Sequence, residues 1–285
     1  MRTALFSMDL EEWFDLKYLE SDVRRREPSV VDGVDRFRAI VEAHGMRCTF
    51  FVLGTFLDAH PQLVASLAAA GHEIALHGAD HRLLYDIPDD EFARITRRAK
   101  ERLEDATGRP VEGFRASCFS MTRAKLELLP ELGFRYDSSR SLFEAPYAAE
   151  RLDLAGWPEL ATGVHARGDF VEFDLTSTPF LGRRVNVAGG GYFRLMPWPL
   201  FRFLVARELR RASVYSFYLH PFETSTARVT SAEVGWSWTS RFRFQVGRRH
   251  AARRLEKLAA LVGESGFEAL TYGEARRRLL TSHAA

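Results

Sequence analysis

Cysteine is scarce in this chain of 285 residues, which contains only Cys48 and Cys118. Two cysteines provide neither a disulfide framework nor a four-cysteine zinc site. Cys48 lies in a hydrophobic run and is expected to be a small core residue.

Long apolar runs and an excess of charge are also missing. No stretch approaches the ~20 apolar residues that a membrane-spanning helix needs. Met1–Met8 is too short for the apolar part of a signal peptide, since Asp9, Glu11 and Glu12 follow at once. The net charge is only +2 and the arginine clusters are scattered, so nucleic acid is not an expected partner. These absences predict a cytoplasmic, soluble protein without a membrane span.

The sequence does contain a regular alternation of strand-like and helix-like segments, and 46% of its residues are hydrophobic, enough for a sizeable core. Apolar or β-rich segments predict strands at Thr3–Leu10, Arg47–Leu53, Glu73–Leu76, Val111–Arg115, Phe134–Asp137, Phe170–Leu175, Val214–Leu219 and Phe267–Leu270. Helical spacing or end signals predict helices around Val34–Val41, Pro61–Ala70, Phe92–Leu103 and Leu255–Val262. This alternation predicts a parallel α/β fold, a barrel or a distorted barrel.

The stretch Gly71–His81 carries the first candidate for chemistry. The predicted strand Glu73–Leu76 runs directly into His77, and His81 follows four residues later. If the chain turns helical after His77, both imidazoles lie on one face and reach one point. Two neutral imidazoles at the carboxyl end of a strand form half of a divalent metal site. Two surface histidines at the start of a helix are the alternative interpretation of this pair alone.

The first predicted strand ends in a cluster of acids. Side chains alternate along an extended chain, so Asp9 and Glu11 should point the same way and Glu12 the opposite way. Two carboxylates on one side can divide the work, one binding a metal and the other accepting a proton. An acid-rich helix N-terminus is the alternative. Trp13, which follows, fits stacking on a sugar and packing of a loop equally well.

Two further predicted strands end in single polar residues. Arg115 can pair with a carboxylate and hold it ionised, unless it is a plain surface arginine. His220 ends an apolar strand and precedes Pro221, a position that core packing explains poorly and that suits a general acid. Because catalytic groups of parallel barrels lie at the carboxyl ends of several strands, these residues are expected to share one site.

In this order and at successive strand ends, the motifs Asp-x-Glu, His-x-x-x-His, Phe-Arg-Ala and Leu-His resemble those of the polysaccharide deacetylase (NodB-homology) family of carbohydrate esterases. The chain is more similar still to the branch found in exopolysaccharide biosynthesis loci. Four segments carry that likeness: Asp9–Phe14, Tyr136–Ser139, Gly189–Arg194 and Tyr218–Pro221. The resemblance covers nearly the whole chain, so it implies a single domain over residues 1–285 with the family's fold, a deformed (β/α) barrel.

The resemblance implies a catalytic role for five residues. Asp9 matches the catalytic base and His220 the general acid. Arg115 matches the arginine that orients the base. Phe119 falls where the family often has tyrosine, whose backbone N–H helps to hold the oxyanion. Asp137 aligns with a residue that orients His220 through a hydrogen bond.

The resemblance also implies a metal site. His77 and His81 match the two metal-binding histidines, and Glu11 matches the metal-binding acid. Glu12 is the rival of Glu11, and the alternation of side chains favours Glu11. The expected cofactor is a divalent metal ion, zinc in the first place, which activates a water for attack.

The implied function is a metal-dependent hydrolase that removes N-acetyl groups from an amino sugar, an oligosaccharide or a polysaccharide precursor. Trp13, Tyr192 and Arg194 are candidates for contact with this carbohydrate, although the run Gly189–Gly191 fits a purely structural turn about equally well. The competing functions are another amide hydrolase on the same scaffold, such as a sugar deformylase or a ring amidohydrolase, and a non-catalytic carbohydrate-binding protein. A complete set of base, ligands and acid argues against the last of these.

Overall fold

The computed structural model describes residues 2–143, 147 and 152–284, and its centre is a ten-stranded sheet. The strands of this sheet are β1 (Thr3–Leu10), β2 (Thr49–Val52), β3 (Glu73–Leu76), β4 (Gly113–Phe114), β5 (Tyr136–Asp137), β6 (Glu159–Ala161), β7 (Val164–Arg167), β8 (Phe170–Phe173), β11 (Val214–Leu219) and β12 (Glu268–Ala269). A separate two-stranded sheet contains β9 (Ser177–Phe180) and β10 (Arg183–Asn186).

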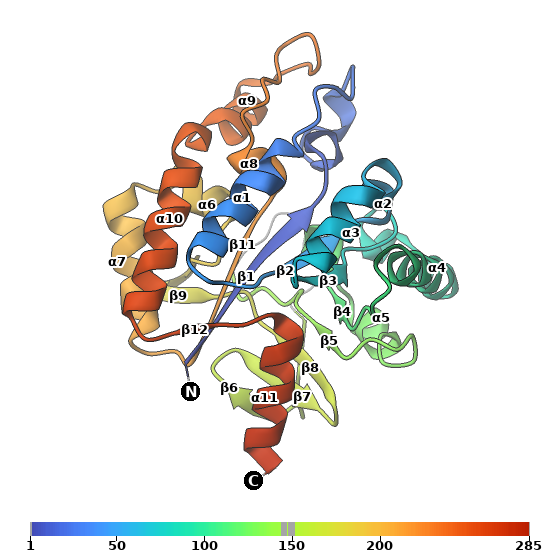
Figure 1. The fold of residues 1–285 in the computed structure, drawn as a ribbon, viewed down its shortest axis with the longest axis vertical. Helices are drawn as coiled ribbons and strands as arrows, with labels where there is room; N and C mark the ends of the chain where they lie inside the picture. The colour runs from blue at the N-terminus through green and yellow to red at the C-terminus, as the bar shows by residue number, and fades with distance from the viewer. Residues whose placement is uncertain (1, 144–146, 148–151, 285) are drawn as a thin grey trace.

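The sheet has the order β11-β1-β2-β3-β4-β5-β8-β7-β6, with β12 beside β1. Strands β11 to β8 of this order are parallel, whereas β7 and β6 are antiparallel to their neighbours. Within the described residues β11 and β6 are the two ends of the sheet, so the curled sheet forms an open barrel (Figure 1). The predicted deformed (β/α) barrel is confirmed.

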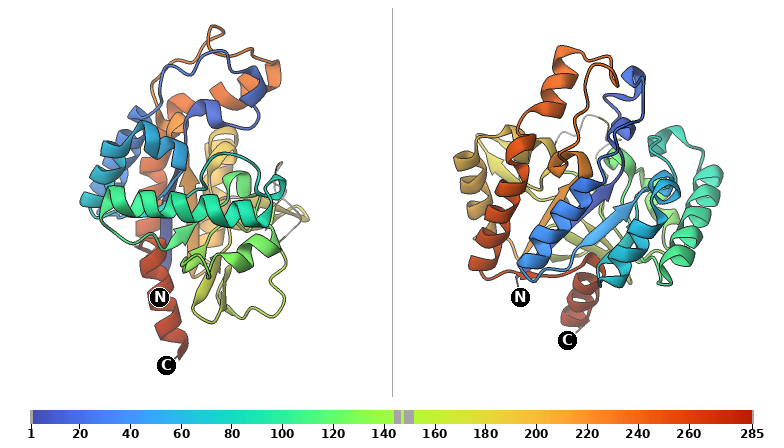
Figure 2. Two further views of the ribbon diagram at one scale, coloured as in Figure 1. Left: turned by 90° about the vertical axis from the view of Figure 1, so that its right-hand side faces the viewer. Right: turned by 45° about the horizontal axis from the view of Figure 1, so that its top comes forward.

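Helices surround the sheet. They are α1 (Asp32–Ala43), α2 (Gly54–Ala59), α3 (Pro61–Ala69), α4 (Asp89–Thr107), α5 (Arg123–Leu128), α6 (Gly190–Leu195), α7 (Trp198–Leu209), α8 (Pro221–Thr224), α9 (Trp238–Gln245), α10 (Arg248–Glu264) and α11 (Tyr272–Ala284), with short 3-10 helices η1 (Trp13–Asp15), η2 (Glu20–Asp22), η3 (Leu84–Asp86) and η4 (Ser117–Phe119). Helix α11 contacts β5 and β6, at the end of the molecule where both termini lie and opposite α9 (Figures 1 and 2).

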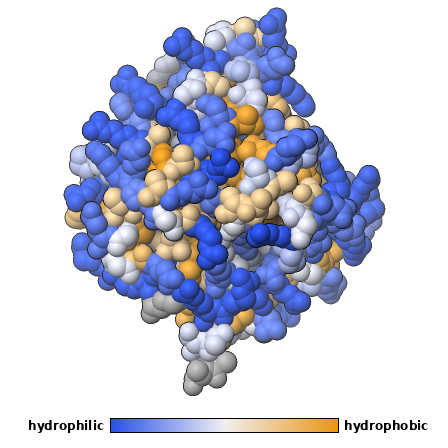
Figure 3. Space-filling view, in the orientation of Figure 1, coloured by the Kyte–Doolittle hydropathy of each residue, from blue (hydrophilic) through white to orange (hydrophobic). Residues whose placement is uncertain are grey.

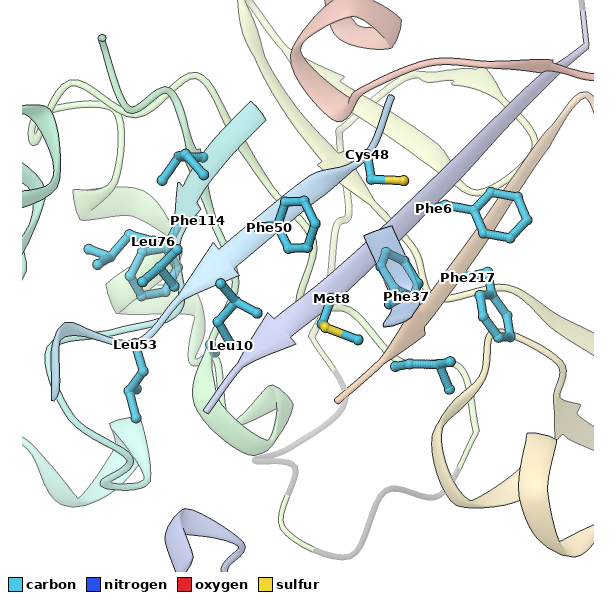
Figure 4. Close-up of a cluster of buried hydrophobic side chains, with 14 of the residues drawn as sticks. Phe6, Met8, Leu10, Phe37, Cys48, Phe50, Leu53, Leu76, Phe114 and Phe217 are labelled. Carbon is cyan, nitrogen blue, oxygen red and sulfur yellow. The ribbon is translucent and has the colours of Figure 1, made fainter. Parts of the chain in front are cut away.

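Strand β1 is the centre of the core because both of its faces are covered. Phe6, Met8 and Leu10 belong to the cluster between the sheet and the outer helices, which also contains Cys48 (Figure 4). Leu5 packs on the other face, inside the curl of the sheet. Every residue of β1 is buried, as its nearly continuous apolar sequence predicts for a parallel strand. The predicted boundaries of β1, β3 and β11 match the structure to the residue.

Among the described helices, none is both long enough and apolar enough to span a bilayer. The face seen in Figure 3 is mostly hydrophilic, and its apolar areas lie between hydrophilic side chains.

Candidate active site

Three potential metal ligands meet where β1 and β3 end. Glu11 directly follows β1, His77 directly follows β3, and His81 lies in the loop after it. The ligand atoms of the three side chains lie within 4.8 Å of one another. The Oε2 atom of Glu11 is 2.6 Å from Nε2 of His81 and 3.7 Å from Nε2 of His77. A carboxylate and two imidazoles at such distances form the donor set of a divalent metal site.

The loop between the two histidines is not the helix that their spacing suggested, so that prediction is wrong. Gly78 has a φ of +98°, which a right-handed helix cannot contain and which glycine adopts without strain. The hydroxyl of Ser117 donates to the carbonyl of His77 at 2.8 Å and fastens the start of the loop. The two imidazoles nevertheless converge, with ring centroids 6.0 Å apart, because the loop turns back at Gly78.

The orientation of His77 suits metal coordination. Its Nδ1 atom lies 3.0 Å from the carbonyl oxygen of Arg115, so Nδ1 carries the proton and Nε2 keeps its lone pair on the side of Glu11. Oε2 of Glu11 is buried and accepts no hydrogen bond among the described residues, and its short contact with His81 is an ion-pair contact. A buried carboxylate oxygen without a hydrogen bond, facing two imidazoles, fits a bound divalent cation.

The charges of Glu11 and His81 support each other. Burial raises the pKa of Glu11, but the charge of His81 and the contacts with His77 and His81 outweigh burial and hold this pKa well below its usual range. Burial lowers the pKa of His81, and the charge of Glu11 outweighs it and raises this pKa. Glu11 is therefore ionised at neutral pH, as a metal ligand must be.

Glu12 points away from this cluster. Its carboxylate accepts hydrogen bonds from the hydroxyl of Ser29 and from the N–H of Val30, the latter at 3.0 Å. Its Oε1 atom also lies 3.1 Å from Nε2 of His60. The alternation of side chains that favoured Glu11 over Glu12 is thus present in the structure, and Glu12 holds the loop before α1.

Asp9 lies on the same side of the chain as Glu11 and is held by Arg115 from the end of β4. The guanidinium NH1 of Arg115 donates to Oδ1 of Asp9 at 2.6 Å and to the hydroxyl of Ser7 at 3.0 Å. Both members of the pair are buried. Oδ2 of Asp9 accepts no hydrogen bond from the residues that the structure describes, so one oxygen is fixed and the other is free for a ligand.

Asp137 supports Arg115 and does not contact His220, so the predicted hydrogen bond between Asp137 and His220 is wrong. Asp137 accepts hydrogen bonds from the N–H and the hydroxyl of Ser139, at 3.1 and 2.8 Å. These bonds fix the turn that contains Ser138. The carbonyl and the hydroxyl of Ser138 each accept a hydrogen bond from Arg115 at 3.0 Å. The physical reason is strand order, since β5 lies beside β4, on the far side of the sheet from β11.

His220 ends β11 and approaches Glu11 from the other side, with its Nε2 atom 3.7 Å from Oε1 of Glu11. Its orienting partner is Glu223, whose Oε2 lies 3.1 Å from Nδ1 of His220 and accepts the backbone N–H of His220 at 3.0 Å. Sequence reasoning missed Glu223. A signal was present, because Pro221 begins a helix and therefore puts Glu223 at the third helical position, where an acid closes a capping box.

Arg194 holds Glu223 in turn. Its Nε donates to Oε1 of Glu223 at 2.6 Å, and its two terminal nitrogens donate to the carbonyls of Val246 and Arg243, at 2.6 and 2.9 Å. Both members of this ion pair are buried. The predicted contact of Arg194 with substrate is therefore not supported, because its guanidinium is fully occupied inside the protein.

The His220–Glu223–Arg194 series keeps the imidazole charged. Burial lowers the pKa of His220, but the hydrogen bond with Glu223 and the charge of Glu11 outweigh burial and raise this pKa to about 9. Burial raises the pKa of Glu223, and the charges of Arg194 and His220 outweigh it and lower this pKa. His220 therefore carries a proton at neutral pH, the state that a general acid requires.

The run Gly189–Gly191 lets α6 begin directly against β11. A Cβ atom at Gly189 would lie 2.0 Å from the carbonyl oxygen of Tyr218, and φ at Gly189 is +123°, so only glycine fits. Helix α6 then directs Arg194 inward and leaves Tyr192 at the surface, with 44% of its area exposed. Of the three predicted carbohydrate contacts, Tyr192 alone keeps an accessible side chain.

Trp13 is fully buried, which excludes stacking on a sugar. Its indole N–H donates to the carbonyl of Pro28 at 2.8 Å, and its ring meets that of Phe244 edge-on at 6.5 Å. Of the two roles predicted for Trp13, the structure supports packing of a loop.

The backbone N–H of Phe119 is also already used. It donates to the carbonyl of Ala116 at 2.9 Å within η4, where Cys118 and Phe119 both have positive φ. The predicted role of this N–H as an oxyanion donor is therefore wrong for the described structure. The ring of Phe119 packs edge-on against Tyr218, with centroids 5.3 Å apart.

Comparison with known proteins assigns the segment that contains the two histidines to a family. Residues 27–136, which contain His77, His81 and Arg115, match the family model for polysaccharide deacetylase. Residues 27–136 thus form a domain of the polysaccharide deacetylase family. Residues 134–271 of the chain, which contain His220, match a domain of unknown function, DUF3473.

Two curated relatives match part of the chain. A peptidoglycan deacetylase-like protein of Gibberella zeae is 30% identical over 115 residues, which are 40% of this chain and 34% of that protein. A peptidoglycan deacetylase of Helicobacter pylori is 24% identical over 107 residues, 38% of this chain and 36% of that protein. The chain thus matches about a third of the length of each relative.

Solved structures share the fold over almost the whole chain. A Mycobacterium smegmatis protein assigned as a polysaccharide deacetylase has a TM-score of 0.62 at 20% identity, covering 99% of this chain and 92% of that one. A CE4 family pseudoenzyme from Bacillus anthracis has a TM-score of 0.56 at 10% identity, covering 97% of this chain and 66% of that one. The fold therefore occurs in proteins with and without activity, and only the site residues can argue for catalysis.

Proposed function

We propose that this protein is a metal-dependent N-deacetylase that hydrolyses the acetamide of an amino sugar, free or within an oligosaccharide or polysaccharide precursor. One observation carries the proposal. A cluster of metal-ligand type, formed by Glu11, His77 and His81, lies between a carboxylate fixed by an arginine and a histidine held protonated by a carboxylate. Metal-assisted hydrolysis of an amide can use these three elements as water activator, base and acid.

Glu11, His77 and His81 would hold the cation, and one carboxylate with two imidazoles suits zinc. A divalent metal in such a site acidifies water and polarises a carbonyl group. Three protein ligands leave further positions for small molecules, in contrast to the four of a structural zinc site.

Asp9 is the proposed base. Arg115 fixes one of its oxygens, and the other accepts no hydrogen bond from the described residues. In this state Asp9 can take the proton of the attacking water while Arg115 and Ser7 keep its position. Positioning matters here, because a proton transfer depends on a stable distance between donor and acceptor.

His220 is the proposed acid. An amine anion is too basic to leave a tetrahedral intermediate, so the sugar nitrogen must receive a proton as the C–N bond breaks. His220 enters this step as an imidazolium, and Glu223 fixes its ring through Nδ1, which leaves Nε2 as the donor.

We further propose that residues 1–285 act as one catalytic domain. The site supports this, because Asp9 and Glu11 precede the segment that matches the deacetylase family, His77, His81 and Arg115 lie within it, and the acid follows it. The central sheet likewise takes strands from all three parts of the chain. Membership of the exopolysaccharide branch and the cytoplasmic location stay predictions.

Release of acetate tests the proposed function. The purified protein should release acetate from at least one member of a panel of N-acetylated amino sugars, their oligosaccharides and their glycosides. A chelator should stop the release and added zinc should restore it, while a His77→Ala, His81→Ala double variant should stay inactive under both conditions. Metal-loaded, folded protein that binds these sugars and releases no acetate from any of them would leave a carbohydrate-binding protein as the function.

A further inference from the structure

A cavity of about 630 Å³ opens on the His220 side of the site, within the size range of small-molecule binding sites. It shares His220 with the proposed reaction centre, so whatever fills it lies next to the reacting group. Apolar and aromatic side chains make up most of its wall: Leu16, Phe119, Phe143, Leu195, Met196, Tyr218 and Phe222.

The polar groups in this wall are mostly engaged within the protein. Arg194 and Glu223 bind each other and their neighbours, as described above. The side-chain oxygen of Asn186 accepts the N–H of Ala188 at 2.7 Å. A sugar ring in this cavity would bury hydroxyl groups with few partners, and each hydroxyl left unpaired would weaken binding.

Four polar side chains of the wall are exceptions within the described part of the chain. The hydroxyl of Tyr18 is buried without a hydrogen bond. The hydroxyls of Tyr147 and Tyr192 make no hydrogen bond, and the guanidinium of Arg243, which lies over the Tyr18 ring at 5.0 Å, donates none. These groups suit single acceptor atoms on an occupant.

The mouth of the cavity is apolar as well. Tyr192 and Leu195 line it and remain 44% and 38% exposed, respectively. A second cavity, of about 440 Å³ on the His81 side, differs sharply, because charged residues such as Asp15, Arg26 and Arg82 line it. Of these two cavities, the one on the His220 side offers the more apolar surface to a large apolar group.

We propose that the substrate carries an apolar group, alkyl or aryl, attached to its N-acetylated sugar, and that this group binds in the cavity beside His220. The inference rests on the proposed function in one respect. The departing amine belongs to the sugar and takes its proton from His220, so the sugar lies on the His220 side and its substituent leads into the cavity. The substrate class is then an amphiphilic glycoside.

A series of N-acetylglucosamine glycosides tests this inference. With the metal-loaded protein, kcat/KM should be about 10- to 100-fold higher for the octyl than for the methyl glycoside, since each buried methylene favours binding. The hexyl glycoside should lie between them, and a phenyl glycoside separates aryl from alkyl preference. Equal kcat/KM values along the series, or a preference for an N-acetylated trisaccharide over the octyl glycoside, would overturn the inference.

Two matched variants locate the effect. Leu195→Gln puts a polar group at the mouth of the cavity and should lower the octyl-to-methyl ratio of kcat/KM by about 3- to 10-fold. Phe203→Gln is the control, because Phe203 is 52% exposed on α7 and does not line the cavity. It should leave the ratio unchanged. An unchanged ratio in folded Leu195→Gln protein would contradict the inference.

Calorimetric binding of the same glycosides separates this inference from the proposed function. Tighter binding of the octyl than of the methyl glycoside supports the cavity assignment even if no glycoside is deacetylated, in which case the proposed function alone fails. Equal binding of both overturns the cavity assignment whether or not acetate is released.

Discussion

Two arginines bind buried carboxylates on opposite sides of Glu11, and the two pairs do different work. Arg115 holds Asp9 and Arg194 holds Glu223, each through a nitrogen–oxygen distance of 2.6 Å. In the first pair one carboxylate oxygen accepts no hydrogen bond from any residue that the structure describes. In the second pair both oxygens are occupied, one by Arg194 and the other by His220.

This difference follows from the two proposed roles. A carboxylate that acts as a base must keep one oxygen open for the proton that it receives. Its arginine can therefore donate a hydrogen bond to the other oxygen only. A carboxylate that orients an acid needs no open oxygen, because the reacting proton leaves from the far nitrogen of the imidazole. Asp9 would therefore act on substrate directly, whereas Glu223 acts through His220. The variants below test this distinction, beginning with the largest expected effect.

Asp9→Asn should lower kcat/KM by about 10²–10⁴-fold on both an N-acetyl sugar and nitrophenyl acetate, because both reactions need activated water. Asparagine keeps a side-chain oxygen for Arg115, so fold and metal content should not change. Hydrolysis rates on the two substrates, together with metal analysis, check this. A loss below 10-fold on both would remove Asp9 from the role of base.

Glu223→Gln should lower deacetylation by about 10²-fold and largely spare nitrophenyl acetate, since nitrophenolate leaves without a proton and an amine does not. Glutamine retains hydrogen-bonding atoms but no longer stabilises the imidazolium charge of His220. Glu208→Gln, a buried glutamate on α7 outside the site, is the matched control and should change neither rate. Equal losses on both substrates in folded Glu223→Gln protein would contradict the orienting role.

Arg115→Lys and Arg194→Lys should have smaller effects, about 3- to 30-fold, because lysine keeps the charge and loses the fork of donors. Their patterns should differ. Arg115→Lys should slow both substrates, since it disturbs the base, whereas Arg194→Lys should slow the N-acetyl sugar more than the ester. Rates are compared at temperatures where circular dichroism shows both variants folded. Identical patterns in the two variants would remove the distinction between the pairs.

Trp13→Phe should have the smallest effect on catalysis, with kcat/KM within about 2-fold of the original, because Trp13 is buried away from substrate. The free energy of unfolding should fall by about 1 kcal/mol with loss of the hydrogen bond to Pro28. Chemical denaturation measures this. A large rise in KM at unchanged stability would indicate that Trp13 contacts the substrate.

The sequence predicted the fold and the first arginine pair because both depend on local signals. Strands β1, β3 and β11 are continuous apolar runs with clear ends, and Asp9 and Arg115 directly follow or close such runs. Because these strands are parallel, their carboxyl ends lie at the same edge of the sheet, whichever loops connect them.

The second pair depends on packing between distant segments, which the sequence does not display. Arg194 points inward to Glu223, and not outward to a sugar, for two reasons. Helix α6 begins directly against β11, and the carbonyls of Arg243 and Val246 accept hydrogen bonds from the guanidinium. Asp137 was misplaced for a related reason, since only the strand order shows that β5 neighbours β4 and not β11. The helical turn considered after His77 does not form, because Gly78 adopts positive φ.

Zinc binding to matched glutamate variants tests the central claim most directly, because Glu11 and Glu12 are adjacent, buried and chemically identical. Calorimetric titration should give about one zinc ion per chain for the unaltered protein and for Glu12→Gln, since one carboxylate and two imidazoles complete a three-ligand site. Glu11→Gln should bind zinc far more weakly while remaining folded. Loss of zinc in Glu12→Gln with full binding in Glu11→Gln would contradict the account.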